Sequence, residues 1–215
     1  MAIAFDSSAS YISGANATTH SWNHTCTGSD LILWVNVMNS NAISVNGVTY
    51  NGVSMNQSAQ STDSQRCTLF YLINPSTGTN TVQVTMASSG FCYTNSASYT
   101  GVKQTGQPEA TTVTNSAAGT TLTCTLTTVT ANSWTVMGVR NASAGDTTAS
   151  TGSFQRASGA GATQFYDSNG VIATPSSYSM SVTASVGSSA YNGVMAAMAP
   201  STGGGSVNSN FLMFM

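Results

Sequence analysis

Apolar and polar residues alternate along many short segments of this chain, and this period of two is its dominant pattern. Residues 80–86, NTVQVTM, place two Val and one Met on one side and polar residues on the other. Residues 120–128, TTLTCTLTT, and residues 177–186, SYSMSVTASV, repeat the arrangement. Such alternation predicts β-strands that bury one face and leave the other in water.

Residues 30–38, DLILWVNVM, are apolar on both sides and predict a central strand that is covered on both faces. No window of eleven or more residues shows the 3.6-residue apolar period of an amphipathic helix. Turn residues separate the strand-like runs, as in the Asn-Gly pair at 51–52, in NPSTGTN at 74–80 and in DSNG at 167–170. The pattern predicts roughly twelve to fourteen short strands and favours an all-β, antiparallel β-sandwich with jelly-roll-like connections.

The length of the chain suits one large all-β domain, and we expect a single β-sandwich domain over residues 1–200. A division into two domains near residue 107, in VKQTGQPEATT, is the alternative. Residues 201–215 begin with a Gly-rich linker and end in an apolar tail. This tail is either a final strand or an anchor that docks on a partner, through Phe211, Leu212, Met213, Phe214 and Met215.

Charge is scarce, because charged residues make up 5% of the chain and the net charge is −2. The four basic residues, Arg66, Lys103, Arg140 and Arg156, are too few and too scattered for a cationic footprint, so we expect no nucleic-acid partner. The longest apolar run, LILWV at 31–35, is too short to cross a bilayer, so we expect no membrane insertion. The N-terminus, MAIAFDSSAS, lacks the features of a signal peptide.

The four cysteines, Cys26, Cys67, Cys92 and Cys124, match no metal or redox spacing. Cys124 falls on the apolar side of its alternating segment, as a small buried side chain would. Buried thiols are therefore the first interpretation, and one or two disulfides remain the alternative.

Candidate chemistry is sparse. The chain has no G-x-S-x-G nucleophile elbow, no P-loop and no dinucleotide fingerprint. A glycosidase needs two carboxyl groups close together. The six acidic residues of this chain are not paired locally, so only the fold could bring two of them together. We therefore predict no catalytic residues, no cofactor and no enzymatic activity.

The segment THSWNHTC places His20, Trp22, His24 and Cys26 on one side of a strand. The two imidazoles would lie about 13 Å apart on a straight strand, too far to share one metal ion. His24 and Cys26, about 7 Å apart, are the closest approach to a metal pair. A polar and aromatic stripe without metal is the simpler interpretation, and we predict no metal site.

Aromatic side chains with polar neighbours could stack on sugars. Trp22, Tyr50, Tyr93 and Tyr166 are the candidates for a glycan-facing surface. Trp34 and Trp134 lie in apolar strands and are expected in the core.

Four segments in order carry a resemblance to a known group of domains: VTYNGVSM at 48–55, LFYLINPSTGTNTVQVTM at 69–86, ASYTGVKQT at 97–105 and SWTVMGVR at 133–140. Together they resemble a β-sandwich domain of phage virion proteins that is also seen in large bacterial surface proteins. The resemblance implies the fold and a structural role, and it brings no catalytic motif.

These observations lead to the expectation of a non-enzymatic phage virion protein, a capsid decoration or fibre subunit or a tail-associated subunit. Its partners would be other virion subunits and further copies of itself, and it would be made in the host cytoplasm and located in the virion. A carbohydrate-binding adhesin or receptor-binding module, with host-surface glycans as partners, is the alternative.

Overall fold

The computed structural model describes residues 1–39, 43–62, 66–115, 119–141, 147–159, 163–184 and 191–202. These residues form strands β1 to β17 and contain no helix, which confirms the all-β prediction. The strands outnumber the roughly twelve to fourteen that the sequence pattern predicts. The difference comes from short elements such as β5 (Val53–Ser54) and β13 (Thr147–Ala149), which are too short to show an alternation.

The first half of the chain forms two antiparallel sheets that face each other. One sheet has the order β1 (Ala4–Ile12), β9 (Cys92–Thr100), β3 (Ile32–Asn39), β7 (Cys67–Ile73) and β6 (Asn56–Gln60). The other has the order β2 (Ala17–Cys26), β8 (Gly78–Gly90), β4 (Val45–Tyr50) and β5. The Asn51-Gly52 turn joins β4 to β5, and both residues have the positive φ that this hairpin turn needs, 50° and 77°.

The second half repeats the arrangement. One sheet has the order β10 (Ala110–Asn115), β17 (Tyr191–Met198), β12 (Trp134–Asn141), β15 (Thr163–Asp167) and β14 (Phe154–Gly159). The other has the order β11 (Thr121–Thr127), β16 (Ser177–Ala184) and β13. The alternating segments seen in the sequence become β8, β11 and β16, and the doubly apolar segment becomes β3, whose residues are all buried.

Each half has the connections of a jelly roll. The first strand pairs with the last, as β1 with β9 and β10 with β17. The second pairs with the one before last, as β2 with β8 and β11 with β16. The third strand pairs with the third from last, as β3 with β7 and β12 with β15. The prediction of a β-sandwich with jelly-roll-like connections is confirmed, and the structure shows that it occurs twice.

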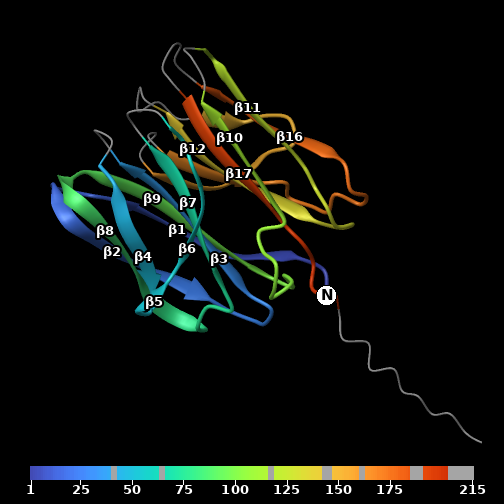
Figure 1. The fold of residues 1–215 in the computed structure, drawn as a ribbon, viewed down its shortest axis with the longest axis horizontal. Helices are drawn as coiled ribbons and strands as arrows, with labels where there is room; N and C mark the ends of the chain where they lie inside the picture. Colours follow the sequence, from blue (N-terminus) through green and yellow to red (C-terminus); the bar gives the residue numbers. More distant parts are fainter. Residues whose placement is uncertain are drawn as a thin grey trace, which may run out of the picture.

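The two jelly rolls pack face to face through their five-stranded sheets, so the body has four layers (Figure 1). β3 lies against β12, while β1 lies against β14 and β6 against β10. Because β14 and β10 occupy in the second half the places of β6 and β1 in the first, equivalent strands exchange places across the interface. This is the contact pattern of a two-fold axis, here passing between β3 and β12 within one chain.

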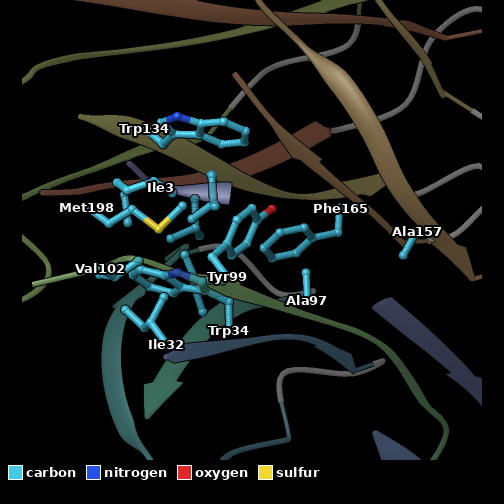
Figure 2. Packing of buried hydrophobic residues seen from close by; sticks show 14 of the residues in the cluster. Ile3, Ile32, Trp34, Ala97, Tyr99, Val102, Trp134, Ala157, Phe165 and Met198 are labelled. Carbon is cyan, nitrogen blue, oxygen red and sulfur yellow. The ribbon is translucent and has the colours of Figure 1, made fainter. Parts of the chain in front are cut away.

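An apolar layer fills the space between the two jelly rolls. Figure 2 shows Trp34 and Tyr99 from the first half gathered with Trp134, Phe165 and Met198 from the second. The rings of Tyr99 and Trp134 meet edge to face with their centroids 6.0 Å apart. These residues form one cluster, so the two halves share a continuous core. Burial of each side chain of this size stabilises the protein by about 1.5–3 kcal/mol.

The predicted single domain over residues 1–200 stays a prediction, since the described strands can be counted as two sandwiches or as one four-layer body. The alternative boundary near residue 107 falls between β9 and β10, where the first jelly roll ends. The expected tail residues, Phe211, Leu212, Met213, Phe214 and Met215, lie outside the described residues.

Candidate functional site

The stripe on β2 is the most chemically varied feature that the sequence indicates. In the structure its side chains point into the interior of the first sandwich. His20, Trp22, His24 and Cys26 are all buried, while the residues between them are exposed. The alternation of this strand therefore places two imidazoles and a thiol inside the molecule.

His24 is held by hydrogen bonds at both ring nitrogens. Nε2 lies 3.0 Å from Ser98 Oγ, and Nδ1 lies 2.9 Å from Ser96 Oγ. Ser98 uses its own hydroxyl proton to bond Asp6 Oδ2 at 2.7 Å, so its oxygen must accept from Nε2–H. With the proton on Nε2, Nδ1 of neutral His24 is an acceptor, so Ser96, which also accepts from Trp22 Nε1–H at 3.1 Å, donates to Nδ1. The network therefore assigns neutral His24 the Nε2–H tautomer.

These bonds form one directed chain from the indole of Trp22 through Ser96, His24 and Ser98 to the carboxylate of Asp6. Asp6 in turn accepts from the backbone N–H of Thr27 at 2.9 Å. The chain joins β1 and β9 of one sheet to β2 of the other, at the corner of the first sandwich where the edge strands β1 and β2 contact each other. This chain of hydrogen bonds is therefore a polar cross-link between strands within a mainly apolar interior.

Burial sets the electrostatics of this corner. Desolvation lowers the pKa of His24 from 6.5 to about 4, against the opposing attraction of the Asp6 carboxylate. Burial likewise raises the pKa of the Cys26 thiol and raises the pKa of Tyr50 to about 12. The neutral form of each group is the one that the folded protein favours.

The corner contains a serine, a histidine and an aspartate, yet their order differs from that of a hydrolytic triad. In a triad the acid holds the imidazole, which faces the serine. Here Ser98 stands between Asp6 and His24, and both Ser98 and His24 are buried. A nucleophile in this position has neither an activated hydroxyl nor access to a substrate.

His20 has a separate set of partners. Its Nε2 lies 3.1 Å from the carbonyl oxygens of Ala17 and Gly90, and Tyr11 packs against its ring. Within the described part of the chain, no three His, Cys, Asp or Glu side chains gather as metal ligands would. The four cysteines are buried and form no disulfide with one another, as the interpretation of buried thiols predicts.

A second charged cluster, which the sequence analysis did not find, lies where β14 meets β1. Arg156 Nε bonds Asp167 Oδ2 at 2.6 Å, and Tyr99 donates to the same oxygen at 2.8 Å. The guanidinium also lies 4.3 Å from the ring centroid of Phe5 and 4.4 Å from that of Phe154. Phe5 and Tyr99 belong to the first half and Arg156 to the second, so this cluster clamps the two jelly rolls together.

The structure buries three of the four aromatic residues that were candidates for glycan contact. Tyr50 and Tyr166 are 0% exposed and Trp22 is 9% exposed. A buried ring has no face for a sugar, so the prediction is wrong for these three residues. Strand alternation indicates the face on which each ring lies, but polar neighbours along a strand do not show that the ring itself is exposed. Tyr93 is half-buried, and its glycan-facing role stays a prediction.

A surface hollow of about 390 Å³ lies at the end of the body where the connection after β9 meets the segment after β17. Its lining includes the oppositely charged side chains of Asp30 and Lys103 together with Gln104 and Thr105. The amide of Gln104 is tied down, since Nε2 donates to the carbonyls of Leu31 and Val102. The hollow is polar and open, and none of the predicted site residues lines it.

Comparisons with protein-family models, curated proteins and solved structures found no match to this chain. The described residues contain no helix with the length and hydropathy that a bilayer span requires.

Proposed function

We propose that this protein is a non-enzymatic structural subunit of a bacteriophage virion, either a capsid decoration or fibre subunit or a tail-associated one. It works by docking on other virion proteins and on further copies of itself. The observation that carries the proposal is the tandem jelly-roll body, because jelly rolls are a recurrent framework of viral capsid proteins. The resemblance of residues 30–140 to virion β-sandwich domains supports the same class.

The outer faces of the body support a docking role. On the sheets of β2 and β11 the outward residues are uncharged, and their hydroxyls pair across strands, as Thr25 with Thr79 at 2.7 Å and Thr123 with Ser181 at 2.8 Å. Contacts made by such a surface depend little on ionic strength, because screening acts on charges. The ionisable groups at the two clusters described above join strands to one another and face the interior.

Mass spectrometry of gradient-purified virions from the strain that encodes the chain tests the proposal. The expected result is a stoichiometric amount of the protein in intact particles. Its absence from particles, with the protein recovered free from the lysate, would overturn the proposal. A variant that lacks residues 207–215 tests the tail as an anchor, since undiminished incorporation would remove the tail from the docking surface.

A carbohydrate-binding role is the second candidate, and one observation favours it. Phe91 is 40% exposed just before β9, and half-buried Tyr93 pairs with Ile12, which is 46% exposed. This is an aromatic and aliphatic surface of the kind on which sugar rings stack. A glycan array on the wild-type protein and on a Phe91→Ala, Tyr93→Ala variant tests it. Binding that the substitutions abolish would support this role, and a clean negative array would reject it.

A further inference from the structure

Strand β11 is an unusual edge in this molecule. Proteins protect the open edges of sheets with bulges, charges, proline or very short strands. Among the described strands, the edge strands β1, β2, β6 and β14 carry bulges, and β5 and β13 are two and three residues long. β10 lies against β6, and Asn115 at its end exchanges hydrogen bonds with Thr62. β11 has seven residues in unbroken register, with no charge and no proline.

The hydrogen bonds of β11 show which of its backbone groups face the open side. Thr128 N–H donates to Ser176 O, and Ala184 N–H donates to Thr120 O, in the same register as the strand pair. Bonded pairs alternate in an antiparallel ladder, so Leu122, Cys124 and Leu126 are bonded to β16. The intervening residues, which are all exposed, turn their N–H and C=O groups to the open edge: Thr121, Thr123, Thr125 and Thr127. In the described part of the chain no backbone group bonds to them there.

The sequence of this edge is a palindrome, Thr-Leu-Thr-Cys-Thr-Leu-Thr, centred on Cys124. If two copies pair antiparallel about a two-fold axis at Cys124, residue 123 faces residue 125 of the other copy and 121 faces 127. Every residue then faces its own kind, and the outward-turned threonines become the hydrogen-bonded pairs. Threonine pairs across strands stabilise sheets. Because the strand is uncharged, two identical edges meet without like-charge repulsion.

We propose that the β11 edge is a self-association surface and that its partner is β11 of a second copy of this chain, paired antiparallel and centred on Cys124. The sheet of β11, β16 and β13 then continues across the dimer. The inference deepens the proposed self-association of a virion subunit and rests on that function only for its biological setting, since a dimer in solution is measurable without a virion.

Cysteine cross-linking tests the register directly. A bonded antiparallel pair has its Cα atoms about 5.5 Å apart, within the range that a disulfide spans. The register also places Cys124 opposite itself within disulfide reach, so all proteins in this test carry Cys124→Ala. In that background, Thr123→Cys protein mixed with Thr125→Cys protein should form a cross-linked dimer on mild oxidation. Each variant alone is the matched control, because residue 123 lies diagonal to its own copy at about 7–8 Å, beyond disulfide reach. Equal cross-linking in the mixture and in the single variants, or none in either, would overturn the proposed register.

Sedimentation velocity over a wide concentration range tests the surface itself. We expect a wild-type dimer and, in Thr125→Pro, a dimer weakened by about tenfold to a hundredfold, because two symmetric hydrogen bonds are lost. No backbone group of the described residues accepts the N–H of Thr125, so proline is compatible with the fold there. Thr125→Val, which keeps the N–H, should dimerise as the wild type does. If the proline variant does not fold, Thr123→Lys with Thr125→Lys serves the same purpose.

A wild-type monomer at all concentrations, or a dimer of equal strength in the edge variants, would overturn the inference. Either result leaves the proposed function standing if the protein is found in virions. Conversely, if the protein dimerises in solution but is absent from virions, the proposed function is overturned and the inference about the β11 interface stands.

Discussion

The side chain of Asn36 in β3 occupies the space that a side chain at Gly138 in β12 would need. A Cβ atom added to Gly138 would lie 2.5 Å from the Asn36 amide. Asn36 donates to Thr163 Oγ1 at 2.9 Å and accepts from the Cys67 thiol at 3.1 Å. Asn36 and Gly138 lie at the centre of the contact between the two jelly rolls. The Asn36 side chain of one half fits there because residue 138 of the other half has no side chain.

Gly138→Ala should therefore destabilise the whole body. The added methyl group has no room beside a side chain fixed by two hydrogen bonds, and overpacking of this kind costs about 1–3 kcal/mol. Urea denaturation measures the loss in the free energy of unfolding. Gly47→Ala is the matched control, since nothing lies within 4 Å of the Cβ position of this strand glycine, and it should change stability by less than about 0.5 kcal/mol. Equal effects of the two substitutions would contradict the described contact.

Replacement of Arg156 should lower the free energy of unfolding, because this residue belongs to the cluster that joins the two halves. In Arg156→Met the buried carboxylate of Asp167 loses its ion-pair partner, and the expected cost is about 3–5 kcal/mol. The double variant Arg156→Met, Asp167→Asn should recover part of that loss because the orphaned charge is gone. Arg66→Met, which removes a partly exposed arginine bonded to Ser44, is the control. A double variant no more stable than Arg156→Met would count against the buried pair.

Stability should fall as the pH drops from about 6.5 to about 4, because burial lowers the pKa of His24 from 6.5 to about 4. In this window the unfolded chain binds a proton at this position that the folded protein does not bind, so acid favours unfolding. The full shift is worth about 3 kcal/mol, present above pH 6.5 and lost by pH 4.

Chemical denaturation across this pH range measures the slope. His24→Gln has no group that titrates there, so the part of the slope due to His24 should vanish even if the variant is less stable at every pH. A slope unchanged by the substitution would show that other groups cause the acid sensitivity.

The thiols should be inert in the folded protein. Burial raises the pKa of Cys92 to about 12 and that of Cys124 to about 11, and all four sulfur atoms are buried. A thiol reagent at pH 8 should not react until denaturant is added, after which all four cysteines of the chain should react. Fewer reactive thiols in denaturant, without a reducing agent, would reveal a disulfide.

The local pattern of the sequence was sufficient for the strands that alternate cleanly. β8, β11 and β16 follow the alternation of apolar residues with Thr, Ser and other polar residues, and the Asn51-Gly52 turn follows from its residues. The sequence does not indicate a short element such as β13, because three residues carry no period. The repetition of the jelly roll was also missed, since it lies in the order of strand pairing and not in any local motif.

The candidate site shows the same limit. The alternation of β2 correctly placed His24 and Cys26 on one side, but it did not say that this side is the interior. The hydrogen-bond partners of His24 are serines of β9 and β1, and the carboxylate of Asp6 also comes from β1. Arg156 and Asp167 stand eleven residues apart and meet through the pairing of β14 with β15. Tertiary contacts of this kind leave no signal in a single sequence.

Electron cryomicroscopy of intact virions is the decisive measurement for the proposed role. We expect density on the particle for a four-layer β body, into which the two jelly rolls fit as one unit with an uncharged outer sheet against a neighbouring subunit. A particle whose density is fully explained by other proteins would rule out the proposed role.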